Sequence, residues 1–409
     1  MNILILGGGS CQLNAVKRCK DRGCKVVVAD YLENAPGKKY ADHSDMASTF
    51  DGEDCLKVAL KYSVDGVFTL GTDQPVYTAA YVADKLGLPF FIDIDTAKAV
   101  TNKKVMKDIF IKNNIPTIKY KILKEDFSCD DINGLKPPFV IKPLDSQGQR
   151  GVYKVNDING IREHMEEVLS FSREKEILAE EFYESDEITV SGWVKQGQPH
   201  ILTVTDRVTF SRGKHIGICA AHRYPSKYLK ERFEEIKDIT NRITEAFGIK
   251  EGPIYYQMLI GDQGVLVNEI ACRIGGAYED IFIPQITAVP VLDMLIDGSL
   301  GLEIDYSLLD RYDILKSNSY LAVYMLFIKP GRIGFMTRME EILSLPGVIG
   351  GCYNFAEGDC IGEISDARFR AGAVIISGKD EEEYIHNVKN ALDHIKIKDE
   401  KGRDLLIRF

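Results

Sequence analysis

The chain has 409 residues, of which 45% are hydrophobic and 27% are charged. These proportions are typical of folded globular proteins and exclude disordered and low-complexity chains. Lys and Arg number 51 against 61 Asp and Glu, and the resulting net charge of −10 argues against nucleic acid as a partner.

Cysteine usage and the N-terminal residues bear on the compartment. The nine cysteines form no CxxC pair, and an odd number of them fits free thiols in a reducing environment. The opening MNILILGGG reads as a strand without a basic signal region, and the longest apolar run, residues 321–328, is too short to span a bilayer. We therefore expect a cytoplasmic protein with no membrane partner.

Short β-rich runs alternate with helical patterns over the first hundred residues. Strands are expected at residues 3–6, 26–29 and 66–70, and helices at 15–22, 54–62 and 77–86. Strands that alternate with helices at this spacing predict a doubly wound parallel sheet with helices on both faces.

The order of predicted elements changes after a helix expected at residues 103–113. Strands are expected at 139–142, 151–155, 177–182, 187–194 and 215–221, with two long helices near 157–171 and 226–247, a pattern typical of α+β folds. A helical pattern covers residues 288–297. The last part of the chain is then expected to form strands within 319–328 and 371–377 and a final helix at 381–395. The sequence thus predicts three domains, residues 1–102, 103–310 and 311–409, the last a small α/β domain, packed together without flexible linkers.

The string GGGSCQ at residues 7–12 follows the first expected strand and opens a helix. With Asp30 near the end of the second strand, it partly matches a dinucleotide fingerprint, but Gln12 replaces the third glycine. A tight turn or a substrate-facing loop is the favoured interpretation, and a dinucleotide-dependent oxidoreductase is the alternative.

The string PPFVIKPLDSQGQRGVY at residues 137–153 is more informative. A strand delivers Lys142, and a loop with two glycines, residues 146–151, separates it from the next strand. Backbone N–H groups of such a loop can cover phosphates while the lysine supplies a positive charge. It is not a Walker loop, and an ordinary surface hairpin with a salt-bridged lysine is the alternative.

Two further strings add acidic groups. In AEEFYESDE, residues 179–187, Glu187 can accept hydrogen bonds from ribose hydroxyls, although acidic clusters are more often solvated faces. In residues 255–279, a predicted hairpin carries Gln257 and Glu269 on its two strands, and both offer the oxygen ligands that Mg²⁺ prefers. Arg273 would add a cation to the same cleft.

The order of these motifs resembles that of the ATP-grasp superfamily, and the resemblance extends over essentially the whole chain. This superfamily includes L-amino acid ligases, carbamoyl phosphate synthetase large subunits and purine-pathway enzymes. The resemblance implies a pre-ATP-grasp domain, a central ATP-grasp fold of two α+β subdomains and a small C-terminal α/β domain. It implies Lys103 and Lys142 as ATP lysines, with Asn102 in place of the usual acid, and it implies a phosphate lid at the loop that contains Ser146, Gln147, Gly148 and Arg150.

The resemblance also implies roles for the remaining candidates. Glu180, Glu181 and Tyr183 resemble the adenine hinge, the latter two through backbone groups, and Glu187 resembles the ribose ligand. Gln257 and Glu269 resemble the metal ligands, but Gln257 replaces the usual Glu and Ala271 the usual Asn. With a single carboxylate, the site is expected to receive Mg²⁺, or Mn²⁺, mainly as the complex with ATP.

These residues predict an ATP-dependent ligase that joins a carboxylate to an amine through an acyl phosphate. Lys142, Arg150 and Arg273 are the expected catalytic cations, and small-molecule carboxylates and amines are the expected substrates, in a protein that can form a homodimer. A purine-pathway ligase or carboxylase, such as phosphoribosylamine–glycine ligase, is one alternative. A nucleotide-binding module without turnover is the other.

Overall fold

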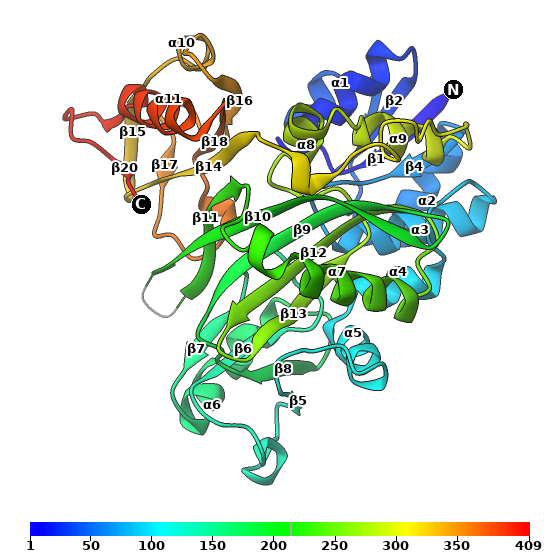
Figure 1. Ribbon diagram of the computed structural model, residues 1–409, viewed down its shortest axis with the longest axis vertical. Helices are drawn as coiled ribbons and strands as arrows, with labels where there is room; N and C mark the ends of the chain where they lie inside the picture. The colour runs from blue at the N-terminus through cyan, green and yellow to red at the C-terminus, as the bar shows by residue number, and fades with distance from the viewer. Residues whose placement is uncertain (213–214) are drawn as a thin grey trace.

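A parallel sheet of four strands begins the chain in the computed structural model, which describes residues 1–212 and 215–409 (Figure 1). The strand order is β3-β2-β1-β4. The side chains of β1 alternate between the two faces, so that Ile3 and Ile5 pack toward α1 while Leu4 and Leu6 join the core formed with α2 and α3. The predicted doubly wound sheet is therefore confirmed. Its elements are β1 (Asn2–Leu6), α1 (Leu13–Asp21), β2 (Lys25–Ala29), β3 (His43–Asp45), α2 (Gly52–Lys61), β4 (Gly66–Phe68) and α3 (Gln74–Leu86).

Two further helices, α4 (Ile94–Thr101) and α5 (Lys103–Lys112), lead into the central part. The residue between them, Asn102, is the N-cap of α5, and its side-chain oxygen accepts hydrogen bonds from the N–H groups of Lys104 and Val105. An Asn in this position satisfies backbone donors that would otherwise lack partners. Asn102 thus starts the helix that carries Lys103, a role that the family's usual acid could fill equally well.

The central part is a largely antiparallel sheet, in the strand order β13-β12-β9-β10-β11-β7-β6-β8-β5. The turn between β9 and β10 places Gln196 and Gly197 at φ 52° and 78°, the left-handed conformation that two-residue hairpins need. Two helices, α6 (Ile158–Ser170) and α7 (Leu229–Ala246), lie close to their predicted positions. The strands are β5 (Tyr120–Lys124), β6 (Phe139–Pro143), β7 (Tyr153–Val155), β8 (Glu176–Glu181), β9 (Ser185–Lys195), β10 (Gln198–Arg212), β11 (His215–Tyr224), β12 (Gly252–Gly261) and β13 (Gly264–Ala271).

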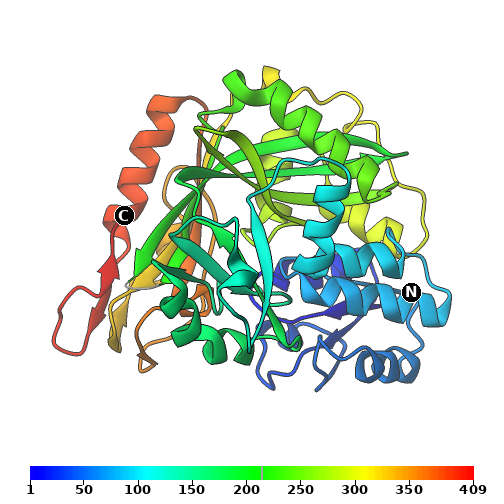
Figure 2. The ribbon, with the colours of Figure 1, turned by 90° about the horizontal axis from the view of Figure 1, so that it is seen from below.

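The C-terminal part continues this sheet, because β14 pairs with β11 in antiparallel register, with Ala221 opposite Tyr324. Figure 2 shows its helix α11 on the side of the molecule away from the N-terminal sheet. The elements are β14 (Tyr320–Ile328), β15 (Gly331–Met336), α10 (Met339–Leu343), β16 (Val348–Tyr353), β17 (Cys360–Ile361), β18 (Gly372–Gly378), α11 (Glu381–His394), β19 (Ile397–Asp399) and β20 (Leu406–Ile407). Short 3-10 helices occupy Pro36–Lys39, Asp130–Ile132, Ile314–Lys316 and Ala367–Phe369.

Two late helices, α8 (Glu279–Thr287) and α9 (Val291–Ser299), complete the cover of the N-terminal sheet (Figure 1). Phe282 and Leu295 belong to the same buried core as Ile3 and Ile5. The sequence pattern predicted a helix near α9 but did not predict α8 or the long strand β10. Within the described residues, no single helix is long and apolar enough to cross a membrane, and only α8 and α9 together, bent by 119°, pass that test of length and composition.

Candidate active site

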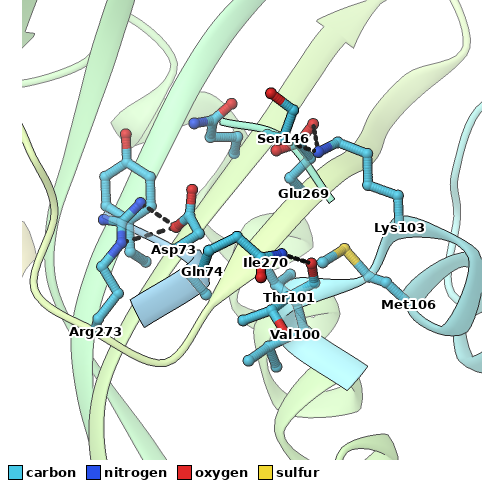
Figure 3. A pocket seen from close by; sticks show the side chains of 13 residues that line it. Asp73, Gln74, Val100, Thr101, Lys103, Met106, Ser146, Glu269, Ile270 and Arg273 are labelled. Carbon is cyan, nitrogen blue, oxygen red and sulfur yellow. Dashed lines mark hydrogen bonds and ion pairs between the residues drawn. The ribbon is translucent and has the colours of Figure 1, made fainter. Parts of the chain in front are cut away.

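A cleft opens between the two halves of the central sheet. It is lined by every predicted site residue except Arg273, namely Lys103, Lys142, Ser146, Gln147, Gly148, Arg150, Glu180, Glu181, Tyr183, Glu187, Gln257 and Glu269. Arg273 lines a smaller cavity that shares Lys103, Ser146, Gln257 and Glu269 with the cleft (Figure 3). The fold therefore brings all the predicted residues to two adjoining spaces.

Three lysines and two glutamates form the floor of the cleft. Lys142 on β6 lies 2.7 Å from Glu180 Oε1 and 3.6 Å from Glu269 Oε1. Lys103, at the start of α5, lies 3.6 Å from the same oxygen of Glu269. Lys107, one turn further along α5, lies 3.3 Å from Glu180 Oε2. The lysines thus hold fixed positions before any ligand arrives, because each is paired with a carboxylate.

The charges of this network follow from its pairing. Burial lowers the pKa of Lys107, the most enclosed of the three lysines. Burial also opposes the charge of Lys142, but Glu180 and Glu269 outweigh it and raise the pKa of that ammonium. Burial likewise opposes ionisation of Glu269, yet the nearby lysines, Lys103 first, lower its pKa to about 2. At neutral pH Glu269 is an anion and Lys142 a cation, as metal and phosphate binding require.

A β-bulge shapes the β12–β13 hairpin, which carries the predicted metal ligands. Gln257 on β12 lies directly opposite Glu269 on β13, but the register then shifts, so that Met258 faces Val267. The extra residue, Asn268, lines the cleft beside Glu269, and its Oδ1 accepts a hydrogen bond of 3.0 Å from Lys142. Bulges let two successive side chains serve one face of a sheet. The alternation of a regular strand would have placed Asn268 on the other face, which is why sequence reasoning missed it.

The donors present fit Mg²⁺ bound together with a polyphosphate. Glu269 supplies one carboxylate and Gln257 one amide oxygen, and no group of three His, Cys, Asp or Glu within the described chain could hold a metal by itself. Mg²⁺ commonly uses one or two carboxylates and completes its shell with phosphate oxygens and water. The hydroxyl oxygen of Ser146 is buried without a hydrogen-bond partner in the described part of the chain, and such a group suits a phosphate oxygen.

The predicted ribose ligand, Glu187, faces the cleft and is paired with Arg207 on β10. Arg207 is only 5% exposed, and its Nη2 also donates to the carbonyl of Gly217 at 3.1 Å. Burial would lower the pKa of this guanidinium, but Glu187 raises it. Sequence reasoning missed Arg207 because the strand that carries it was not predicted.

The hinge residues have different surroundings from one another. The carboxylate of Glu180 is used by the lysines and is 2% exposed. The backbone N–H of Glu181 donates to the carbonyl of Lys119 at 3.0 Å. The hydroxyl of Tyr183 donates to the carbonyl of Gly264 at 3.1 Å, so its side chain braces the β12–β13 turn. The adenine-binding roles of these three residues stay predictions.

The glycine-containing loop, residues 146–151, is docked on both neighbouring parts. Gln147 Oε1 accepts hydrogen bonds from the N–H groups of Asp73 and Gln74, the latter at 3.2 Å. The carbonyl of Gly148 accepts from the N–H of Ala367 at 3.1 Å. Arg150 donates through Nε to the carbonyl of Gln147 at 3.2 Å, and within the described residues no carboxylate lies within ion-pair distance of it. Its charge is therefore available to a phosphate.

Arg273 is held by the N-terminal part. Its Nε donates to Asp73 Oδ1 at 2.8 Å, and Figure 3 shows the pair on the side of the smaller cavity opposite Lys103 and Ser146. Asp73, which follows β4 in the N-terminal part, lines both spaces. Glu279, close enough to interact with Arg273, is 1% exposed, and burial raises its pKa to about 7.

The loop at residues 7–12 is closed by its own side chains. The carboxylate of Asp30 accepts hydrogen bonds of 2.8 Å from the N–H groups of Gly8 and Leu32. The amide of Gln12 lies against Gly7 and donates to the carbonyl of Leu70 at 2.8 Å. Asp30 thus shapes the loop, which agrees with the tight turn favoured above.

Comparisons with known proteins agree with this geometry. Residues 135–280 match the model of the ATP-grasp domain, and residues 324–400 match the L-amino acid ligase C-terminal domain 2. The chain belongs to the ATP-grasp superfamily. It is an ATP-dependent ligase of the carboxylate–amine type, as the sequence predicted.

Individual relatives of this ATP-grasp ligase cover most of its length. Dapdiamide A synthase of Enterobacter agglomerans is 22% identical over 346 residues, which are 81% of this chain and 80% of the relative. The L-amino acid ligase from Bacillus licheniformis superposes with a TM-score of 0.81 at 19% identity, over 98% of both chains. Phosphoribosylglycinamide synthetase from Anaerococcus prevotii superposes with a TM-score of 0.76 at 17% identity, over 98% of this chain and 99% of that one. Both of these solved structures share the fold of this chain.

Proposed function

We propose that this ligase joins the carboxylate of one amino acid to the amino group of a second, with ATP as the energy source and Mg²⁺ as the metal. The observation that carries the proposal is that cationic side chains face one another across the cleft and the adjoining smaller cavity. Lys103 and Lys142 lie with Glu269 on one side, and Arg273 lies on the other. A phosphate transferred from ATP to a carboxylate would lie between them. The match of residues 324–400 to the L-amino acid ligase domain supports amino acids as the substrates.

The cleft residues bind and neutralise ATP. Lys142 and Lys103 offer ammonium groups to the phosphates, and Ser146 offers an unpartnered hydroxyl. Glu269 and Gln257 would hold Mg²⁺, which when bound offsets phosphate charge. Preorganised cations of this kind stabilise charge as it develops and need no rearrangement during reaction.

The first chemical step activates the carboxylate. An oxygen of the substrate carboxylate bonds to the γ-phosphorus of ATP, the bond from that phosphorus to the bridging oxygen breaks, and ADP leaves. The product is an acyl phosphate. Arg273, fixed by Asp73, supplies a guanidinium that can bind the carboxylate and then the acyl phosphate, because its planar donors match paired oxygens.

The second step forms the amide. The nitrogen of the amine attacks the acyl carbon, the carbon–oxygen bond to phosphate breaks, and the nitrogen loses a proton. Water would destroy the acyl phosphate, so the loop at residues 146–151 must cover the site during this step. Its hydrogen bonds to residues 73 and 74 and to residue 367 support a closed position of this lid.

A purine-pathway ligase is the second candidate, because phosphoribosylglycinamide synthetase shares the fold over nearly the whole chain. The experiment that separates the candidates supplies Mg·ATP with pools of amino acids, with glycine and phosphoribosylamine, or with bicarbonate, and measures ADP. We expect ADP release that requires a pair of amino acids and is lost at least 100-fold in Lys142→Ala, an order of magnitude typical for the loss of preorganised charge.

The matched control is Lys121→Ala, which removes an exposed lysine of β5 outside the cleft and should keep wild-type turnover. Release that depends on phosphoribosylamine instead would establish the second candidate. Nucleotide binding without turnover in any pool would contradict both and indicate a binding module.

A further inference from the structure

Arg370 stands where the three parts of the chain meet. It lies between a 3-10 helix (Ala367–Phe369) and β18 in the C-terminal part. Its carbonyl accepts a hydrogen bond of 3.0 Å from the side chain of Asn354, whose Oδ1 accepts one of 2.7 Å from the hydroxyl of Ser10. The backbone of Arg370 is therefore tied to the first loop of the N-terminal sheet.

Among the described residues, the guanidinium of Arg370 has no anionic partner. Its Nε is buried without a hydrogen-bond partner, and within the described part of the chain no carboxylate lies within ion-pair distance of it. By contrast, Arg273 is paired with Asp73, and Arg368 with Asp366. An unpaired guanidinium in a partly buried place is costly unless an anion completes it.

Arg370 lies among side chains from all three parts of the chain. Burial raises the pKa values of Cys11 in the N-terminal part, Tyr278 and Cys352, and the nearby charge of Arg370 opposes each rise. The Tyr278 hydroxyl lies 2.9 Å from the sulfur of Cys352. Arg273 also acts on Cys11. The two guanidiniums thus flank the same short segment, and Cys11 lies against Gly71, two residues before Asp73.

The same junction holds acceptors for an amino group. Asp280 is 4% exposed, and its Oδ1 has no hydrogen-bond partner among the residues that the structure describes, while its Oδ2 accepts a hydrogen bond of 2.8 Å from Asn14. The charge of Asp280 acts on Cys11, as does that of Arg370. An unpaired cation and an unpaired acceptor around one segment match the two charged ends of an α-amino acid.

We propose that Arg370 binds the carboxylate of the amino acid that supplies the amino group, and so selects an amino acid as the amine donor. This inference rests on the proposed function. The carboxylate to be activated has to lie in the cavity that Arg273 shares with the phosphate and metal residues, whereas Arg370 lines neither that cavity nor the cleft. Arg370 is therefore left for the second substrate, on the side of the N-terminal loop to which Asn354 ties its backbone.

The test compares each amino acid that is active as amine donor in the pool screen with its C-terminal amide, which keeps the amino group and lacks the carboxylate. The measured quantity is the ratio of kcat/KM for the acid to that for the amide. A charge-assisted pair predicts a fall of roughly 10- to 100-fold in this ratio in Arg370→Gln. Arg370→Lys keeps the charge without the planar fork and should show a smaller fall.

Because the amount of folded enzyme cancels in the ratio, reduced stability of a variant does not affect the result. The control is Arg368→Gln, two residues away, whose side chain is 60% exposed and already paired with Asp366, and whose ratio should stay at the wild-type value. A ratio unchanged in Arg370→Gln, or a wild-type enzyme that uses the amide equally well, overturns the inference alone. No turnover with any amino-acid pair, or turnover only with a phosphorylated sugar amine, overturns the proposed function and the inference together.

Discussion

Replacement of Glu279 by Gln should change how the stability of the protein depends on pH. Glu279 lies at the start of α8 and is 1% exposed, and the charges of Arg273 and Asp280 act on its pKa. Its Oε2 accepts a hydrogen bond of 2.7 Å from the N–H of Ala277, which a glutamine oxygen can also accept, while Oε1 has no partner. Burial raises the pKa of the carboxyl from 4.5 to about 7.

The sign follows from proton linkage. Between pH 4.5 and about 7 the unfolded chain releases the proton while the folded protein keeps it, so the free energy of unfolding falls as the pH rises. At about 1.4 kcal/mol for each pKa unit, the penalty is about 1 kcal/mol at pH 5 and about 3 kcal/mol at pH 8. Glutamine has no charge to bury. The free energy of unfolding of Glu279→Gln, relative to that of the wild type, should therefore be roughly 2 kcal/mol higher at pH 8 than at pH 5.

Thermal unfolding followed by scanning fluorimetry at the two pH values measures this difference. For a chain of this size, roughly 2 kcal/mol corresponds to a shift in Tm of roughly 2–3 °C. The absolute Tm at one pH is not diagnostic, because the new amide NH₂ occupies the unpartnered position and adds a pH-independent cost. Glu234→Gln, at an exposed position of α7, is the matched control and should show no difference. An equal Tm shift of Glu279→Gln at pH 5 and pH 8 would refute the reasoning.

Three further variants test the cleft. Gln257→Glu adds a second carboxylate opposite Glu269, and the Mg²⁺ concentration for half-maximal ADP release should fall roughly ten-fold; no fall would argue against a metal at this hairpin. Gln147→Ala removes the acceptor for the N–H groups of residues 73 and 74, so ADP release without an amine should rise relative to amide formation; unchanged coupling would contradict a lid. Asp73→Asn leaves Arg273 without its carboxylate and should lower kcat roughly ten-fold while the KM for ATP stays unchanged; an altered KM with normal kcat would place Arg273 on the nucleotide.

Several site residues were predictable because local chemistry and spacing identify them. Lys142 lies on an apolar strand before a loop with two glycines, and Glu269 lies on one strand of a hairpin opposite Gln257. Lys107 was missed, although its position four residues after Lys103 on a predicted helix places both side chains on one face. Such spacing could have suggested a second lysine at the floor of the cleft.

Other features carry no local signal. Asn268 reaches the cleft through a bulge, and an alternating strand pattern predicts the opposite face for it. Arg207 lies on β10, which reads ambiguously in the sequence, and its partner Glu187 is 20 residues away. Asp73 and Arg273 are separated by 200 residues, and their pairing depends on how the N-terminal sheet packs against the ATP-grasp part.

The sequence by itself determined the parallel sheet, the mixed character of the central part and the superfamily, because hydrophobic periodicity and short motifs act within a few residues of one another. The tertiary structure alone decided that α8 and α9 close one face of the first sheet, that β14 extends the central sheet through β11, and that Asn354 links Arg370 to the loop of Ser10. These arrangements depend on contacts between segments hundreds of residues apart. Burial and backbone pairing select such contacts only once the whole chain has folded.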